Sequence, residues 1–269
     1  MTVPPVVLSI AGFDPSCGAG VTADVKTAAA HNCYAITCVT AMTVQSTRGV
    51  RQVAPQDPEV LRGVLSELAS DLPPLAVHIG MLGSGAVAAV VLDYLHRYTP
   101  PNVVLDPILH SSSGTELLDA AGVAILRTQL LSLAGVVTPN LDEAAALSGQ
   151  PIRDLQGMKE AAAKLHQLGA RAVVVKGGHL RGSETVELLS VQKGSGVEQW
   201  EFPGPKLQTR ATHGTGCAFA TALACNLALG KALPDAVAAA KNYVSTAIAR
   251  AYPLGAGAGP MNHLYRIDR

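Results

Sequence analysis

Val6-Val7-Leu8-Ser9-Ile10-Ala11 is a short apolar run that predicts a buried strand. A loop from Gly12 to Gly20 follows it, and the Ala-rich stretch from Val21 to His31 is typical of a helix. Ala35 to Met42 is again rich in β-branched residues, which favour strands. A strand, a helix and a second strand in this order predict a βαβ unit with two parallel strands.

The rest of the chain repeats the same alternation. Further strands are expected at Leu75–Ile79, Asn102–Leu105, Gly135–Thr138 and Ala172–Lys176, and helices at Glu59–Ala69, Val87–Tyr98, Leu141–Leu147, Leu155–Leu168, Thr215–Leu229 and Pro234–Ala251. Thr185–Val191 and Glu198–Phe202 are expected to form a hairpin. Apolar strands separated by helices indicate an α/β fold of three layers, in which helices cover both faces of a mostly parallel sheet. The hairpin adds antiparallel strands at one edge, and without an interdomain linker we expect one domain over residues 1–269.

Composition narrows the class of protein. The chain has 269 residues, 48% of them hydrophobic and 15% charged, with a formal net charge of +0, which does not favour a nucleic-acid partner or a membrane surface. No apolar stretch reaches the roughly 20 residues that span a bilayer. The five cysteines are odd in number and contain no Cys-x-x-Cys pair, so a disulfide scaffold or zinc site is not indicated and a cytoplasmic location is expected.

Thr212-His213-Gly214-Thr215-Gly216-Cys217 leads directly into an expected helix. Glycines allow backbone amides to approach a ligand closely, and the first amides of a helix lack intrahelical acceptors. Together with the helix dipole, this arrangement suits phosphoryl oxygens. On the local pattern alone, an ordinary helix start capped by Thr215 or His213 remains an equal interpretation.

Cys217 falls in the first turn of that helix. A thiol at a helix N-terminus is expected to have a pKa below the usual value of about 8.5, which would allow it to accept a proton from an attacking hydroxyl. A buried structural thiol is the common alternative, and it is the interpretation that we adopt for Cys225.

Polar residues also follow other expected strands. Asp106 stands at a strand end before Pro107, and Asn140 and Glu143 share one helix face. Carboxylates with an amide can hold Mg²⁺ through water, although Thr138-Pro139-Asn140 is also a good helix-capping signal. Lys176 precedes Gly177-Gly178-His179 and is suited either to nucleotide phosphates or to simple solvation. Ligands of parallel sheets bind beyond the carboxyl ends of the strands, where all these residues fall.

Common nucleotide-binding and metal-binding motifs are absent. The sequence has no Gly-x-x-x-x-Gly-Lys-Ser/Thr loop, no Gly-x-Gly-x-x-Gly after the first strand, no protein-kinase signature set and no His-Glu-x-x-His. A kinase with this sequence would need a different nucleotide cradle.

An ordered series of motifs resembles the hydroxymethylpyrimidine/phosphomethylpyrimidine kinases of thiamine biosynthesis, which belong to the ribokinase-like superfamily. The resemblance covers essentially the whole chain. Its blocks are Ser9–Gly12 with Asp14-Pro15-Ser16, Gly18–Gly20, Ala23–Thr27, Thr43–Val50, Ile79–Leu82, Leu105–Pro107, Thr138–Ala144, Val175–His179, Thr212–Cys217 and Gly259–His263.

The resemblance implies a ribokinase-like fold, ATP and Mg²⁺ as cofactors, a small-molecule substrate, transfer of the γ-phosphate and a homodimer. The implied substrate pocket contains Gly12, Asp24, Val44, Gln45 and Met81, and Gln45 suits the donors and acceptors of an aminopyrimidine edge. The implied roles of the other residues are catalysis by Gly214, Thr215, Gly216 and Cys217, contact with the nucleotide by Thr212, Asn140 and Lys176, and binding of the metal by Asp106 and Glu143.

The chain departs from the family pattern at three positions. Phe13 and Cys17 are bulkier than the residues usual in the first loop, and His110 is atypical after Asp106-Pro107. These changes would reshape the pocket, so a pyridoxal or pyridoxine kinase remains an alternative, although Gln45 and Cys217 argue against it. A non-catalytic ligand-binding protein on the same scaffold is the second alternative.

Overall fold

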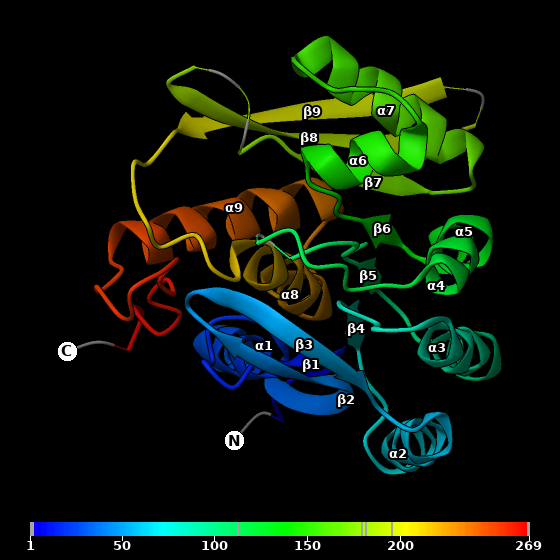
Figure 1. Cartoon of the computed structure of the whole chain (residues 1–269). Helices are drawn as coiled ribbons and strands as arrows, with labels where there is room; N and C mark the ends of the chain where they lie inside the picture. The colour runs from blue at the N-terminus through cyan, green and yellow to red at the C-terminus, as the bar shows by residue number, and fades with distance from the viewer. Residues whose placement is uncertain (1–2, 112, 179, 181, 195, 268–269) are drawn as a thin grey trace.

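The computed structural model describes residues 3–111, 113–178, 180, 182–194 and 196–267. Over these residues, nine strands form one sheet in the order β3-β2-β1-β4-β5-β6-β7-β8-β9 (Figure 1). Strands β1, β2 and β4 to β7 are parallel, and β3, β8 and β9 are antiparallel to their neighbours. The strands are β1 (Val6–Phe13), β2 (Tyr34–Ser46), β3 (Gly49–Pro55), β4 (Ala76–Ile79), β5 (Val103–Leu105), β6 (Val136–Val137), β7 (Ala172–Lys176), β8 (Glu184–Lys193) and β9 (Gly196–Pro205).

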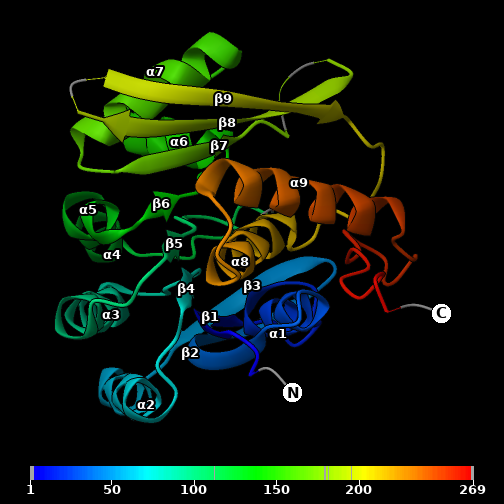
Figure 2. The ribbon, with the colours of Figure 1, turned by 180° about the vertical axis from the view of Figure 1, so that it is seen from behind.

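Helices cover both faces of this sheet (Figures 1 and 2). One face carries α2 (Pro58–Asp71), α3 (Gly85–Tyr98), α4 (Ala120–Ile125), the π-helical turn η1 (Leu126–Leu130), α5 (Leu131–Leu133), α6 (Leu141–Ser148) and α7 (Leu155–Gln167). The other face carries α1 (Gly20–Ala30), α8 (Thr215–Ala228) and α9 (Leu233–Ala249). The expected three-layer α/β fold with a mostly parallel sheet is therefore confirmed.

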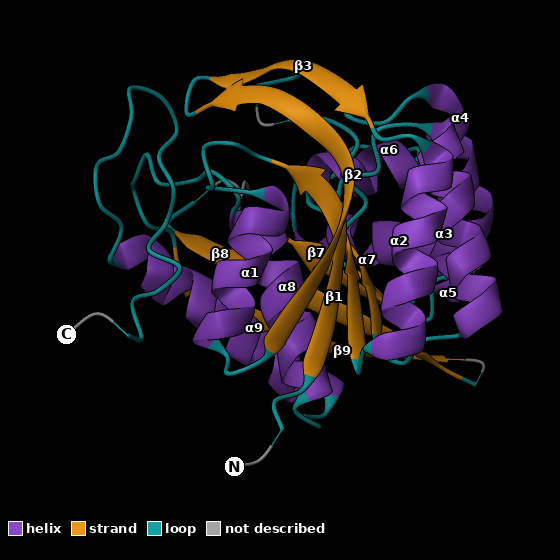
Figure 3. Ribbon diagram, turned by 90° about the horizontal axis from the view of Figure 1, so that it is seen from below, coloured by secondary structure: helices purple, strands orange, loops and turns teal. Residues whose placement is uncertain are grey.

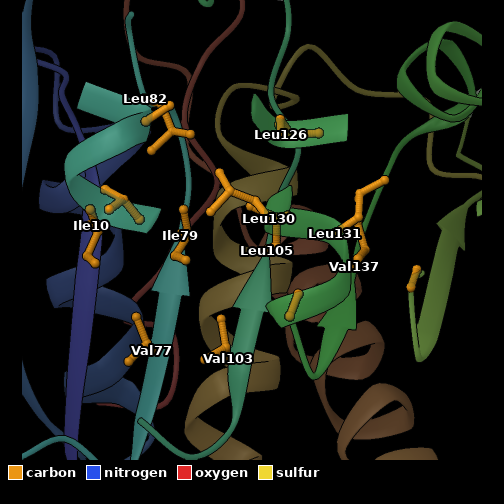
Figure 4. Close-up of a cluster of buried hydrophobic side chains, with 14 of the residues drawn as sticks. Ile10, Val77, Ile79, Leu82, Val103, Leu105, Leu126, Leu130, Leu131 and Val137 are labelled. Carbon is orange, nitrogen blue, oxygen red and sulfur yellow. The ribbon is translucent and has the colours of Figure 1, made fainter. Parts of the chain in front are cut away.

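Alternation along the strands creates two separate cores. In β1, Leu8 and Ile10 join the first core, while Val7, the residue before Leu8, joins the second. Figure 4 shows part of the first core, where Val77 and Ile79 of β4 lie beside Val103 and Leu105 of β5. Because the parallel strands are buried on both faces, they are mostly apolar, which made them recognisable in the sequence.

Local signals fix several helix starts. Asp57 accepts hydrogen bonds from the amides of Glu59 and Val60 at 2.8 and 3.3 Å and caps α2. Asn140 and Glu143 form a capping box at α6, with bonds of 2.9 and 2.8 Å between each side chain and the backbone of the other residue. The capping interpretation of Asn140 is thus confirmed.

The structure also contains elements that the sequence patterns did not predict. β2 continues to Ser46, beyond the expected end at Met42, and turns back into β3. Both strands arch past the end of β1 (Figure 3). The segment from α4 to α5 was not predicted either, although its three helical pieces are contiguous and Leu126, Leu130 and Ala134 are buried at a spacing of four residues. The late hairpin is confirmed as β8 and β9. Among the described residues, no helix has the length and hydropathy of a membrane span.

Candidate active site

A cavity of about 1480 Å³ lies at the carboxyl ends of the parallel strands. Its wall includes Asp14 after β1, Asp106 after β5, Lys176 at the end of β7 and the start of α8. The β2–β3 arm adds Gln45 and neighbouring residues from one side. The volume exceeds the roughly 300–1,000 Å³ of a site for one drug-sized ligand, so there is room for two molecules side by side.

The start of α8 faces this cavity. Gly214, the N-cap residue, has a φ of 74°, a left-handed conformation that glycine adopts without steric cost, and its backbone packs closely against Gly18. The first donor within the helix is Ala218, whose amide bonds to the carbonyl of Gly214 at 3.0 Å. The amides of Thr215, Gly216 and Cys217 therefore precede the intrahelical hydrogen bonds, and all three residues line the cavity. The anion-site geometry expected from the sequence is present.

A buried ion pair lies against this turn. Lys176 Nζ is 2.7 Å from Asp106 Oδ1, which also accepts a hydrogen bond of 3.0 Å from Thr138. Burial opposes the charged form of Lys176, but Asp106 and Glu143 outweigh it and raise the lysine's pKa. A methyl group on Gly216 would lie 3.1 Å from Lys176 Nζ and 3.5 Å from Asp106 Oδ2. A glycine at position 216 thus leaves room for the ion pair to approach the helix start.

Glu143 supplies a second carboxylate at the same place. Burial and the charge of Asp106 outweigh Lys176 and raise the pKa of Glu143 from 4.5 to about 7. A carboxyl with a raised pKa beside another carboxylate would gain from an added cation. Among the described residues no group of three or more His, Cys, Asp or Glu could hold a metal alone. Asp106 and Glu143 therefore fit a Mg²⁺ ion that takes its other ligands from water and phosphate.

Gln45, Met81 and Gly12, which the resemblance implies for the substrate ring, also line the cavity. Gln45 Nε2 lies 3.3 Å from His213 Nε2, so this part of the wall is next to the start of α8. A Cβ on Gly12 would lie 3.0 Å from the sulfur of Met81, so glycine at position 12 allows the Met81 side chain to pack against the backbone there. Thr43 donates a hydrogen bond of 3.0 Å to Gln45 Oε1 and fixes the amide. Thr212 is exposed at the rim, on the side of Lys206 to Thr209.

Two residues expected in the substrate pocket lie elsewhere. Val44 is 55% exposed and is not part of the cavity wall, because neighbouring residues of a strand point to opposite faces and Gln45 faces inward. Asp24 is fully buried on α1, where its carboxylate accepts hydrogen bonds from Ser9, His78 and Thr221. Both placements in the pocket were wrong.

The expected ionisation of Cys217 was wrong as well. Burial, Asp24 and Asp106 raise the pKa of the thiol, and they outweigh a hydrogen bond from the backbone of Gly20 and the charge of Lys176. The helix start favours a thiolate, but two nearby carboxylates oppose it. Cys217 is thus a thiol at neutral pH in the unliganded protein.

Asp14 and His213 form a pair that the sequence interpretation missed. His213 Nε2 lies 2.7 Å from Asp14 Oδ2 and 3.3 Å from Gln45 Nε2. Burial disfavours ionisation, but hydrogen bonds from His213 and Ser16 lower the pKa of Asp14 from 3.8 to about 2. The pair ties the first loop to the start of α8 across the cavity. Both residues lie in the motifs quoted above, but the spacing of 199 residues conceals their contact.

The structure gives positions for most of the other residues that the sequence singled out. Asn140 lines the cavity while capping α6. Phe13 and His110 also line the cavity, and Cys17 belongs to the first loop, where it has a φ of 60°. His179, which belongs to one of the quoted motifs, lies outside the described residues.

The fold and this site define a ribokinase-like protein. The family model described as phosphomethylpyrimidine kinase matches residues 14–262. The chain is 41% identical over 260 residues to the hydroxymethylpyrimidine/phosphomethylpyrimidine kinase of Streptomyces coelicolor, covering 97% of this chain and 94% of the relative. It belongs to the phosphomethylpyrimidine kinase family.

The chain is also similar to a longer bifunctional protein and to a solved structure. The thiamine biosynthesis bifunctional protein ThiED of Geobacter sulfurreducens is 41% identical over 262 residues, 97% of this chain, which spans only 53% of that longer protein. The structure of an ADP complex of Bacillus subtilis pyridoxal kinase is similar with a TM-score of 0.87 and 33% identity, covering 98% of this chain and all of that one.

Proposed function

We propose that this protein is an ATP-dependent kinase that phosphorylates the hydroxymethyl group of hydroxymethylpyrimidine and then its monophosphate. One observation carries the proposal. The amides that open α8, the Lys176–Asp106 pair and the thiol of Cys217 all line one cavity, whose wall also includes Gln45 and Met81. The family membership and the names of the relatives agree with this function.

The chemistry follows from these positions. The substrate hydroxyl attacks the γ-phosphorus in line, with the ring held against Gln45. The amides of Gly214 to Cys217 stabilise the charge of the transferring phosphoryl group. Cys217 positions the hydroxyl as an uncharged thiol, and the hydroxyl proton passes to an oxygen of the transferred phosphoryl group while ADP leaves. Phosphoryl transfer depends mainly on positioning and charge, so no strong base is required.

Asp106 and Glu143 would hold Mg²⁺, which when bound neutralises phosphate oxygens. Lys176 keeps Asp106 in place and faces the nucleotide from the other side. Asn140 and Thr212 line the same part of the cavity and contact the nucleotide in this proposal.

Pyridoxal kinase is a second candidate, which the similarity to the Bacillus subtilis enzyme favours. Pyridoxal also carries a hydroxymethyl group on a nitrogen heterocycle. The higher identity to hydroxymethylpyrimidine/phosphomethylpyrimidine kinases and the amide of Gln45 favour the pyrimidine. A non-catalytic binding protein is a third candidate, and the presence of Asp106, Glu143, Lys176 and Cys217 in one cavity argues against it.

A product-resolved assay separates these functions. The purified protein is incubated with Mg-ATP and hydroxymethylpyrimidine, its monophosphate or pyridoxal, and the products are resolved by mass. We expect phosphorylation of both pyrimidines at a higher kcat/KM than that of pyridoxal. A preference for pyridoxal would overturn the substrate assignment, and binding of the pyrimidine without ADP formation would identify a non-catalytic protein.

The proposal treats residues 1–269 as one kinase domain, acting in the cytoplasm as a homodimer. One continuous sheet through the described residues supports a single domain. Met42 and Val44 are 49% and 55% exposed on β2 and would be covered in a dimer. Sedimentation at micromolar concentration tests the dimer, and a monomer would remove this part of the proposal.

A further inference from the structure

Four fully buried polar side chains lie beneath the start of α8, outside the cavity wall. Asp24 of α1, His78 of β4, Ser9 of β1 and Thr221 of α8 are each 0–2% exposed. Asp24 Oδ2 accepts hydrogen bonds from Ser9 at 2.6 Å and from His78 Nδ1 at 3.2 Å, and its Oδ1 lies 2.6 Å from Thr221 Oγ1. This group, called the Asp24 network below, joins strands β1 and β4 to helices α1 and α8.

The Asp24 network is hydrogen-bonded directly to the first turn of α8. Thr221 Oγ1 lies 2.9 Å from the carbonyl oxygen of Cys217, one helical turn earlier, as well as 2.6 Å from Asp24. Its single proton is therefore shared between the buried carboxylate and the backbone of residue 217. The hydroxyl couples the position of the Cys217 peptide to a fixed point in the sheet.

Charge strengthens this fixed point. Burial opposes ionisation of His78, but the charge and hydrogen bond of Asp24, followed by the charge of Asp106, outweigh it and raise the pKa of His78. A buried carboxylate needs such a partner, because an isolated buried charge is very costly. Asp24 also acts electrostatically on the thiol of Cys217, whose other charged neighbours are Asp106 and Lys176.

We propose that Asp24 and His78, acting through Thr221, are positioning residues that hold the first turn of α8 in place for phosphoryl transfer. The inference rests on the proposed kinase function for its kinetic part only. Neither Asp24 nor Thr221 lines the cavity, so their effects on activity must pass through α8.

The kinetic test replaces the hydroxyl without changing its volume. Thr221→Val is expected to lower kcat about 10-fold or more while KM for ATP stays within about twofold, because a small misplacement of reacting groups slows the chemical step. Thr221→Ser restores the hydroxyl and should return kcat to within about threefold of the wild type. Thr128→Val is the matched control, because Thr128 makes the same bond to the carbonyl four residues earlier, at 2.8 Å, on an exposed surface.

The second test needs no enzymatic activity. Amide hydrogen exchange of the α8 peptide is followed by mass spectrometry in the wild type and the variants. Thr221→Val and Asp24→Asn should each speed exchange in the first turns of α8 several-fold, because the bonds that join this helix to Asp24 are lost or weakened. Exchange in α3, which lies on the other face of the sheet, is the control, because a variant that is destabilised as a whole would exchange faster there as well.

The outcomes separate this inference from the proposed function. If the wild type does not phosphorylate the pyrimidine, the proposed function fails and hydrogen exchange in α8 alone decides the inference. Unchanged exchange in the first turns of α8 in Thr221→Val, a wild-type kcat in Thr221→Val, or a Thr221→Ser variant as slow as Thr221→Val would each overturn it.

Discussion

Lys176 and Asp106 come from β7 and β5, 70 residues apart, yet their charged groups lie 2.7 Å apart beside Gly216. The side chain of Asp106 is 2% exposed and that of Lys176 is 14% exposed. This pair gives the cavity a positive and a negative group at the point where α8 presents its free amides. It joins two strands of the sheet, and it belongs to the part of the site that is proposed to face phosphate.

Removing the lysine should therefore destabilise the fold as well as slow the reaction. Lys176→Met leaves Asp106 buried without its cation, and losing one partner of a buried pair costs about 3–5 kcal/mol in the free energy of unfolding. Urea denaturation measures this loss. The matched control is Lys159→Met, which breaks an ion pair to Glu201 whose side chains are 34% and 44% exposed and should cost about 1 kcal/mol or less. Equal losses in the two variants would contradict the buried pair.

Gly216→Ala should impair catalysis without a comparable loss of stability. The added methyl group would meet Lys176 and Asp106 at the helix start, where the phosphoryl group is proposed to lie. We expect kcat to fall about 100-fold, the size of effect seen when charge-stabilising donors are disturbed. Gly63→Ala is the control, because nothing lies within 4 Å of its added carbon, and it should leave kcat unchanged. A normal kcat in Gly216→Ala would place the phosphate elsewhere.

Glu143 should make stability depend on pH in the direction opposite to most carboxyl groups. Its pKa rises from 4.5 to about 7 on folding, so the folded protein binds the extra proton between these values. Stability from this group is complete below about pH 4.5 and is lost as the pH rises through about 7. Glu143→Gln, which preserves the capping acceptor, should remove this slope from urea denaturation between pH 5 and 7. The same slope in both proteins would show that Glu143 is not the responsible group.

Gln45→Leu tests the pyrimidine end of the cavity. The substitution keeps the size of the side chain but removes its hydrogen bonds, so KM for hydroxymethylpyrimidine should rise about 10-fold or more while KM for ATP is unchanged. Val44→Thr is the control at the neighbouring position, whose side chain is outside the cavity wall. If Val44→Thr changed KM as much as Gln45→Leu, the inward face of β2 would have been assigned wrongly.

The sequence predicted the fold well because its physical signals are local. Buried parallel strands are mostly apolar, and caps such as Asn140 with Glu143 mark helix starts. β3 was not predicted because Gly49–Pro55 is largely exposed on both faces and lacks a clear alternation. The helical segment from α4 to α5 was missed although Leu126, Leu130 and Ala134 recur every four residues and are buried.

The candidate site was predictable where one motif carries it and not where contacts join distant segments. The motif from Thr212 to Cys217 predicted the start of α8. The hydrogen bond between Asp14 and His213 could not be predicted, because it depends on how the first loop packs against α8. Val44 was misplaced because the expected strand ended at Met42; once β2 continues to Ser46, the period of two residues puts Val44 and Gln45 on opposite faces. The misplacement of Asp24 in the substrate pocket could not be avoided, because packing sets the rotation of α1 about its axis.

The most direct test of the account compares Cys217→Ala with the wild type in two measurements on the same preparation. Steady-state turnover of hydroxymethylpyrimidine gives kcat, and titration calorimetry gives the affinity for Mg-ATP. We predict that kcat falls at least about 100-fold while the Kd for Mg-ATP stays within about threefold, because the thiol acts on the acceptor hydroxyl rather than on the nucleotide. An unchanged kcat at equal ATP affinity would show that Cys217 does not take part in the reaction.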